Sequence, residues 1–251
     1  MKQIVVVKVG GAPLDNPQYL DQLAIYLQNI RDKGHQIVLV HGGGKEISKI
    51  HEVYGLPFIK KAGLRVTPPE SMALVSMVLC GLVNKRLVSH MNRFNLKAVG
   101  LSGVDFHMMK SDLLNEREYG RVGGPPRVIT TPLCQLLKEN HLIVLAPVCA
   151  GPDGAPVNVN ADVSAQAVAI ALEAKRLDFV TDVQAVKTQE GPRQQLQSAE
   201  VPKLIEDEIV QGGMIPKLTS GIAALEGGVS HVRVGNISSL THNTATEVTL
   251  S

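Results

Sequence analysis

Short apolar runs alternate along this chain with longer stretches in which apolar residues recur at helical spacing. Residues 3–9 and 37–41 form two such runs, rich in valine and isoleucine, and each has the length of a buried strand. Between them, apolar residues three or four positions apart predict an amphipathic helix, with Asn16 as its N-cap, Pro17 in its first turn and Gly34 at its end. A strand–helix–strand unit of this kind should form a right-handed parallel crossover.

The same alternation continues towards the C-terminus. Thr67, Pro68 and Glu70 have the spacing of a capping box, which predicts that a long helix begins there. Residues 105–130 carry charge, glycine and a Pro-Pro pair, so we expect a hairpin-like excursion. Further strands are predicted at 97–101, 142–148, 177–183 and 232–234, and further helices at 161–174, 201–211 and 214–226. Strands alternating with helices predict an α/β fold, a three-layer α/β/α sandwich whose mostly parallel central sheet is covered on both faces.

Composition narrows the class of protein. The 251 residues suffice for one large domain or two tightly joined lobes, and the formal charge of +2 does not favour a nucleic-acid partner. The chain has no tryptophan and few other aromatic residues, so it offers no platform for stacking bases. The first apolar run is too short for a signal peptide, and we expect no membrane-spanning segment. The three widely spaced cysteines indicate buried thiols in a reducing cytoplasm, and no metal-ligand cluster is visible.

Two lysines close to glycine pairs carry most of the candidate chemistry. Lys8 precedes Gly10-Gly11 at the end of the first predicted strand, and Lys217 follows Gly212-Gly213. A third glycine cluster, Gly42–Gly44, follows the second predicted strand. Glycine lets backbone N–H groups approach an anion closely, and lysine adds a mobile charge. Because ligands of parallel sheets bind beyond the carboxyl ends of the strands, these segments predict a phosphate site, although they match neither the Walker A nor the dinucleotide-binding spacing.

Other polar residues have an ordinary explanation beside a functional one. Asp162 opens a predicted helix, where an acid commonly serves only the helix dipole. Asn158 and Asn160 suit a turn and an N-cap. Arg65 has the chemistry to clamp a carboxylate with two hydrogen bonds, but an isolated arginine is more often an ordinary surface residue. Lys8 could likewise extend from a strand end into solvent. From the residues alone, these alternatives stay open.

The order of these segments along the chain resembles the amino-acid kinase family over nearly the full length. The matching segments are Lys-x-Gly-Gly at 8–11, His-Gly-Gly-Gly at 41–44, Gly-Leu-Arg-Val-Thr at 63–67, Asn-Lys-Arg at 84–86, Gly-Leu-Ser-Gly-Val-Asp at 100–105, Asn-Val-Asn-Ala-Asp at 158–162, Thr-Asp-Val at 181–183 and Gly-Gly-Met-Ile-Pro-Lys at 212–217. The third and sixth of these are the most specific. The resemblance implies the carbamate kinase-like fold of the family. It also implies an N-terminal lobe, residues 1–175, for the acyl amino acid and dimerisation, and a C-terminal lobe, residues 176–251, for ATP, with both lobes sharing one sheet.

Within the family, the pattern is similar to members that transfer the γ-phosphoryl group of ATP to the side-chain carboxylate of N-acetyl-L-glutamate, a step of arginine biosynthesis. A carboxylate with a pKa near 4 is already ionised at neutral pH, so this reaction requires no general base. The resemblance implies N-acetyl-L-glutamate and ATP as substrates, with Mg²⁺ carried on the ATP phosphates rather than in a protein cage. It further implies a cytoplasmic homodimer, to which the helix predicted near residues 68–93 could contribute, without a nucleic-acid or membrane partner. Because the chain starts almost directly at its first strand, we expect no arginine-inhibited hexamer.

The resemblance also implies residue roles. Lys8 and Lys217 would flank the transferring phosphoryl group as catalytic residues, and Asp162 would orient both lysines. The acyl substrate would be bound by Gly43, Gly44, Arg65, Asn158 and Asn160. The Gly10-Gly11 turn would admit the ATP phosphates. The remaining nucleotide-binding positions would be Thr181, Asp182, Val183, Gln184, Ala185, Val186, Val210, Gln211, Gly212 and Gly213, and no residue is implied as a metal ligand.

Two departures from the family pattern leave questions open. Ala185 stands where the family often has glycine, which would strain the turn if a positive φ were required there. Residues 243–247 replace a usual Gly-x-Gly-Thr segment, which leaves the pairing of the final strand open. The rival functions are a kinase for N-acetyl-L-2-aminoadipate of lysine biosynthesis, or its carrier-linked form, a carbamate kinase, and a non-catalytic module that senses an amino acid or nucleotide. One methylene separates the first rival from our prediction and is worth only about 1–3 kcal/mol of discrimination.

Overall fold

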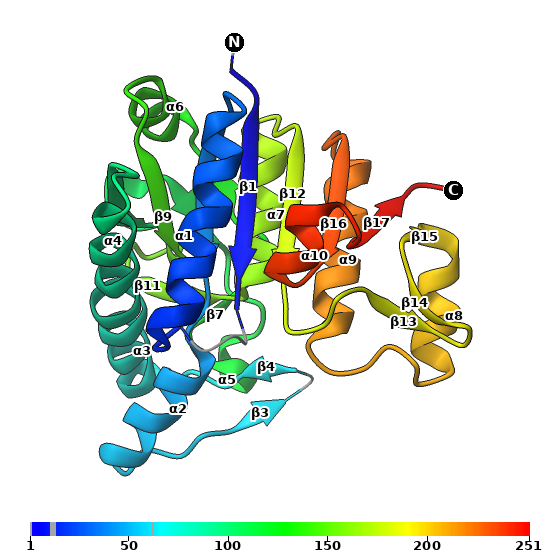
Figure 1. Ribbon diagram of the computed structural model, residues 1–251. Coiled ribbons are helices and arrows are strands. Elements are labelled where there is room, and N and C mark those ends of the chain that lie inside the picture. Colours follow the sequence, from blue (N-terminus) through cyan, green and yellow to red (C-terminus); the bar gives the residue numbers. More distant parts are fainter. Residues whose placement is uncertain (1, 11–13, 62) are drawn as a thin grey trace.

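An eight-stranded sheet forms the centre of the computed structural model, which describes residues 2–10, 14–61 and 63–251 (Figure 1). The strand order is β15-β17-β16-β12-β1-β2-β9-β5. Every pairing in this sheet is parallel except that of β16 with β17, so the prediction of a mostly parallel sheet is confirmed. The strands are β1 (Ile4–Val9), β2 (Gln36–His41), β5 (Ala98–Ser102), β9 (Leu142–Ala146), β12 (Arg176–Val180), β15 (Gln195–Gln197), β16 (His231–Gly235) and β17 (Thr246–Thr249).

Helices cover both faces of this sheet, which confirms the three-layer arrangement. Alternate residues of β1 enter opposite layers: Val6 belongs to one buried cluster, and Val5 and Val7 belong to the other. The cluster of Val6 is covered by α6 (Thr131–Lys138), α7 (Ala161–Ala171), α8 (Val201–Glu206) and α9 (Met214–Glu226). The other cluster is covered by α1 (Pro17–Asp32), α2 (Gly44–Val53), α3 (Pro69–Ser76), the π-helix η1 (Met77–Val83), α4 (Asn84–Arg93) and α10 (Ile237–His242).

A second, five-stranded sheet contains the excursion predicted at residues 105–130. Its order is β7-β11-β10-β6-β8, with β6 (Met109–Lys110), β7 (Val122–Gly123), β8 (Arg127–Val128), β10 (Val148–Ala150) and β11 (Pro156–Val159). The predicted strand 142–148 is split at Pro147 into β9 and β10, since a proline has no N–H to donate to a ladder. The remaining elements are the hairpins β3 (Lys60–Lys61) with β4 (Leu64–Arg65) and β13 (Val186–Thr188) with β14 (Gly191–Arg193), the short helix α5 (Glu116–Tyr119), and the 3₁₀ turns η2 (Asp105–His107) and η3 (Ser198–Glu200).

The capping box predicted at Thr67 is wrong. The helix begins at Pro69, Pro68 occupies the N-cap position, and no side chain caps the first turn. The Thr67 hydroxyl instead donates a hydrogen bond to the carbonyl oxygen of Arg65 at 2.7 Å. Thr67 therefore stabilises the loop that carries Arg65, because its hydroxyl is turned back towards that loop.

The helical run Pro69–Arg93 bears on the expectation that the chain has no membrane-spanning segment. Among the described residues, this run of 25 residues is the one helix that is long and apolar enough to cross a membrane, by length and composition alone. Half of its most apolar window is buried inside the fold. Met72, Val75 and Leu87 pack in the same cluster as β1 and β2, so we interpret this run as a core helix.

The two departures from the family pattern are accommodated in the fold. The backbone at Ala185 does not have a positive φ, so alanine is not strained there. The altered segment 243–247 leads directly into β17, which pairs with both β16 and β15. Its Thr246 is fully buried, donates to the Arg193 carbonyl and accepts from the Val186 N–H.

The predicted lobes share the central sheet at β1 and β12. Position 175/176 falls between α7 and β12, and β12 pairs along its whole length with β1. The division of function between residues 1–175 and 176–251 stays a prediction.

Candidate active site

The carboxyl ends of β1, β2 and β12 lie side by side at one edge of the parallel sheet (Figure 1). Lys8 is the penultimate residue of β1, and the glycine segment 42–44 follows β2 directly. In sheets of this kind, ligands bind beyond this edge. The fold therefore brings segments that are far apart in sequence to the edge where a ligand is expected.

Lys8, Asp162 and Lys217 meet at this edge and are almost completely buried. Lys8 Nζ lies 2.8 Å from Asp162 Oδ1, and Lys217 Nζ lies 3.7 Å from Asp162 Oδ2. The Lys8 contact is an ion pair without the direction of a hydrogen bond, because Asp162 Oδ1 accepts no hydrogen bond within the described residues. Asp162 occupies the first turn of α7, where its N–H donates to Oδ1 of the N-cap residue Asn160 at 2.7 Å. The structure thus brings together the three residues that we predicted to be catalytic, and their roles stay a prediction.

One carboxylate between two ammonium groups leaves this cluster with an excess of positive charge. Burial lowers the pKa of Lys217, the charge of Lys8 lowers it further, and Asp162 only partly opposes both effects. Lys217 Nζ also donates to the Gly213 carbonyl at 2.9 Å, which fixes its position at the start of α9. Buried cations with too little counter-charge favour binding of an anion, because the anion completes the compensation.

The structure explains in a different way at each position why a glycine stands beside these lysines. A Cβ atom at Gly10 would lie 2.5 Å from Lys8 Nζ, so glycine leaves the space that the ammonium group occupies. Gly212 has φ of +55°, in the left-handed region that favours glycine. A Cβ at Gly213 would be in ordinary contact with Lys217 Nζ, at 3.9 Å. Gly11 lies outside the described residues.

A cavity of about 220 Å³ is lined by all five residues that we predicted to bind the acyl substrate. They are Gly43, Gly44, Arg65, Asn158 and Asn160. The Asn158 amide donates to Thr67 Oγ1 at 3.2 Å, which connects it to the loop of Arg65. Their assembly from the β2–α2 turn, the β3–β4 hairpin and the β11–α7 turn creates a compact polar site beside the N-terminus of α2.

Arg65 is positioned in this cavity by an aromatic ring. Its guanidinium carbon lies 3.9 Å from the centre of the Phe58 ring, and its Nη2 donates to the Gly44 carbonyl at 3.2 Å. Its Nη1 is buried and has no partner among the described residues. Burial lowers the pKa of Arg65 to about 10, so the side chain remains cationic at neutral pH. A cation with one unsatisfied buried donor is suited to a carboxylate ligand.

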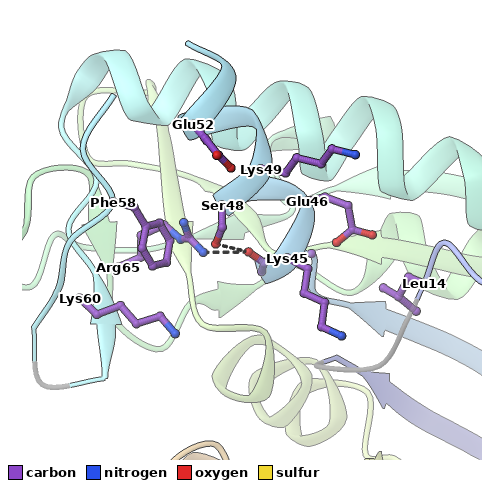
Figure 2. Close-up of a pocket in the computed structure, with 11 residues that line it drawn as sticks. Leu14, Lys45, Glu46, Ser48, Lys49, Glu52, Phe58, Lys60 and Arg65 are labelled. Atoms are coloured by element: carbon purple, nitrogen blue, oxygen red, sulfur yellow. Dashed lines mark hydrogen bonds between the residues drawn. The ribbon is translucent and has the colours of Figure 1, made fainter. Parts of the chain in front are cut away.

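A second cavity of about 590 Å³ adjoins the first and shares Gly43, Gly44, Lys60 and Arg65 with it. Figure 2 shows the Phe58 ring against Arg65 on one side of this cavity and Lys45 and Lys60 at its lower edge. Phe58 and Lys60 are residues that sequence analysis missed. The sequence did contain one signal for Phe58, because it lies shortly before Arg65 in a segment that could form a hairpin and so bring the two side chains together.

The predicted nucleotide positions lie in two segments, one after β12 and one before α9. Residues 181–186 follow β12, and residues 210–213 precede α9. The Thr181 hydroxyl donates to Asp182 Oδ1 at 3.0 Å, and the charge of Asp182 acts on Lys217 to raise its pKa. Ala185, Val186 and Val210 are buried. Neither of the two cavities above is lined by these segments, so their role stays a prediction.

The acidic, histidine and cysteine residues do not form a metal site. Among the residues that the structure describes, no group of three or more is placed to hold a metal ion. Asp162, the buried carboxylate nearest to the site, is already paired with two lysines.

Fold and site together define an α/β protein that collects cations beyond the carboxyl ends of parallel strands, beside a cavity suited to a carboxylate. Residues 3–236 match the model of the amino acid kinase family, and the chain belongs to this family. It is similar to the acetylglutamate kinase of Chloroflexus aurantiacus, with 41% identity over 99% of this chain and 98% of the relative.

Solved structures show the same likeness. A protein from Streptococcus mutans, 32% identical, superposes with a TM-score of 0.88 over 99% of both chains. The carbamate kinase of Giardia lamblia bound to AMP-PNP has a TM-score of 0.73, covering 100% of this chain and 99% of that chain, but is only 15% identical and supports the fold alone.

Proposed function

We propose that this protein transfers the γ-phosphoryl group of ATP to the side-chain carboxylate of N-acetyl-L-glutamate. The observation that carries the proposal is the buried Lys8–Asp162–Lys217 cluster beside a cavity that contains an arginine with an unpartnered donor. The similarity to relatives named acetylglutamate kinase supports the choice of substrate. The product is an acyl phosphate, which links the reaction to arginine biosynthesis.

The cations solve the main physical difficulty of this reaction, which is to bring a carboxylate to a polyanion. The carboxylate oxygen attacks the γ-phosphorus while the bond to the β-phosphate oxygen breaks, and ADP leaves with the bonding electrons. Charge spreads over the transferring group in the transition state, and preorganised cations stabilise it without reorganisation. Lys8 and Lys217 supply that charge from β1 and from α9, and Asp162 holds the two ammonium groups in place.

The acyl substrate occupies the smaller cavity in this proposal. Arg65 binds the α-carboxylate through its fork of donors, and Asn158 and Asn160 fix the amino-acid part. Gly43 and Gly44 direct backbone N–H groups from the start of α2 towards the anionic groups. Gly43 has a packing reason to be glycine, because a Cβ there would lie 2.8 Å from Leu79 Cδ2.

In this proposal ATP binds on the C-terminal side, along residues 181–186 and 210–213, with Gly10 near its phosphates. ATP also carries Mg²⁺ on its phosphates in this proposal, where the ion would neutralise part of their charge.

We infer that the protein is a cytoplasmic homodimer. The N-terminal lobe offers an apolar surface for this assembly, since Met77 and Leu82 on η1 are about half exposed. These two side chains are the apolar contacts that the helix would contribute to the proposed interface.

Parallel assays with two acids test the choice of substrate. The enzyme should use N-acetyl-L-glutamate with a higher kcat/KM than N-acetyl-L-2-aminoadipate, because Arg65 and the β2–α2 turn line a cavity of only about 220 Å³ in which the longer acyl chain needs more room. One additional methylene is expected to change kcat/KM by about 10- to 200-fold. A preference for the longer acid would assign the protein to the alternative reaction.

A further inference from the structure

His41 is a buried polar residue at the carboxyl end of β2 that the proposed mechanism does not use. Its side chain has no exposed surface. Nδ1 lies 2.9 Å from the carbonyl oxygen of Gly42, and Nε2 lies 3.1 Å from the Asn84 amide nitrogen. The residue thus connects α4 with the glycine segment that lines the acyl-substrate cavity.

The partners of His41 determine which ring nitrogen carries the proton. Burial lowers the pKa of His41 to about 4, so the ring is neutral at physiological pH. A carbonyl oxygen can only accept, so Nδ1 must be the donor and Nε2 the acceptor. The Asn84 amide nitrogen then donates to Nε2, and it also donates to the carbonyl oxygens of Val144 at 3.0 Å and Leu101 at 3.4 Å. The donor and the acceptor of each hydrogen bond between Gly42, His41 and Asn84 are therefore fixed.

Asn84 is itself fixed tightly. Its side chain is buried, and its Oδ1 accepts a hydrogen bond from Lys85 Nζ at 3.3 Å. A Cβ atom at Gly100 would lie 2.0 Å from Asn84 Oδ1, so the neighbouring strand β5 has glycine where the amide needs space. Asn84 therefore acts as a rigid support for the imidazole ring.

Both the N–H and the C=O group of Gly42 are fixed by hydrogen bonds. Its N–H donates to the Val9 carbonyl at 2.9 Å, and its C=O accepts from His41. In a trans peptide, the C=O and the following N–H point in opposite directions. The Gly42–Gly43 peptide is thus fixed with its oxygen towards the buried ring and the Gly43 N–H facing away from it, at a residue that lines both cavities.

We propose that His41 and Asn84 are positioning residues that hold the Gly42–Gly43 peptide so that the Gly43 N–H is aimed at the reacting anion. This inference rests on the proposed phosphoryl transfer to an acyl carboxylate. Without the hydrogen bond from His41, the Gly42–Gly43 peptide can rotate, and the Gly43 N–H no longer points towards the reacting anion. The ground-state contacts of ATP on the far side of Lys217 are unaffected.

Three variants test this role, each measured for kcat, for KM of both substrates and for thermal unfolding. His41→Leu should lower kcat about 10- to 100-fold, as expected for a misplaced donor, while the KM for ATP changes less than about threefold. His41→Asn retains a donor near the position of Nδ1 and should recover most of this loss. His90→Leu is the matched control, because His90 is also buried and bonds Asp21 at 2.8 Å, but it does not contact the glycine segment. It should lose stability and keep kcat.

Equal kcat in His41→Leu and the wild-type protein would overturn the inference. A loss of kcat that His41→Asn does not recover, or that His90→Leu reproduces, would also overturn it, because the effect would then be general destabilisation. If the wild-type protein forms no acyl phosphate, the proposed function is wrong. The positioning role of His41 can then still be tested by NMR, which does not depend on activity. The backbone amide shifts of Gly43 and Gly44 should move in His41→Leu and return in His41→Asn, and unmoved shifts would contradict the positioning role.

Discussion

At the scale of single residues, the buried lysine pair is the feature on which the mechanism depends. Lys8→Ala and Lys217→Ala should each lower kcat about 10²- to 10³-fold, the loss typical when one preorganised group that stabilises transition-state charge is removed. Both variants should remain folded, because each deletion relieves repulsion between two buried ammonium groups as well as removing an ion pair. Steady-state kinetics with circular dichroism as a folding control measures both effects. A variant that is folded and fully active would remove that lysine from the mechanism.

The pH dependence provides an independent check on Lys217. Burial and the charge of Lys8 lower its pKa below the ordinary value of 10.5, and the mechanism needs the protonated form. The value of kcat/KM should therefore fall on the alkaline side at a pH below 10.5, since kcat/KM reports the free enzyme. This decrease should be absent from the residual activity of Lys217→Ala.

Phe58 should influence binding of the acyl substrate without touching the transferring group. Its ring stacks on Arg65, and a cation–π contact of this kind is worth about 0.5–2 kcal/mol. Phe58→Leu should therefore raise the KM for N-acetyl-L-glutamate about 2- to 30-fold, with kcat and the KM for ATP nearly unchanged. Phe58→Tyr keeps an aromatic face and serves as the control. An unchanged KM in the leucine variant would mean that Arg65 needs no aromatic support.

At the scale of elements, a buried cluster ties α1 to the sheet. Asp178 on β12 has no exposed surface, pairs with Arg176 and Arg233, and accepts from the Tyr26 hydroxyl at 2.6 Å. Burial alone would raise the pKa of Asp178, but the hydrogen bond and charge of Arg233, with Arg176, outweigh it and lower the pKa. The carboxylate thus stabilises the fold fully above the unfolded pKa near 3.8, and this contribution is lost as pH falls through the lower folded pKa.

Asp178→Asn should destabilise the protein by about 3–5 kcal/mol, because it leaves two arginines without their buried counter-charge. Tyr26→Phe removes a neutral hydroxyl that donates to the carboxylate and accepts from Arg233, and it should cost less, about 1.5–3 kcal/mol. Urea unfolding at neutral pH compares the two variants. If Asp178→Asn unfolded at the same urea concentration as the wild-type protein, the cluster would be structurally unimportant.

The regular elements were predictable from sequence because their signals are local. The continuous run of valines in β1 and the Asn16 cap of α1 depend only on neighbours in the chain, and both predictions are confirmed. The capping box at Thr67 failed because its hydroxyl is drawn to the Arg65 loop, which is a tertiary contact. The second sheet was missed as a sheet, since its strands of two to four residues are too short to show periodicity.

The site was predictable for a different reason. Lysine within an apolar strand, and glycines at strand ends, stand out against the pattern around them, and the resemblance to a known family supplied the order of the segments. The Phe58–Arg65 stack and the His41–Asn84 chain were not visible, because each joins segments whose distance is set only by the folded sheet.

At the scale of the whole molecule, one sheet connects the proposed acyl-substrate side to the proposed nucleotide side. β1 carries Lys8 and pairs with β2, which leads into the substrate turn, and with β12, which leads into the predicted nucleotide segment. In the proposed mechanism, the acyl substrate and ATP therefore reach the cation cluster from the two strands that flank β1. The sheet and α9 together bring Lys8 and Lys217, which are distant in sequence, to one carboxylate.

Hydroxylamine trapping of the product tests the central claim most directly. The wild-type protein, supplied with ATP, Mg²⁺ and N-acetyl-L-glutamate, should form the hydroxamate of an acyl phosphate in an amount equal to the ADP released. Omitting the acyl acid should abolish both. A folded protein that binds ATP but yields no hydroxamate from this acid or its longer analogue would contradict the account and identify the fold as a non-catalytic sensing module.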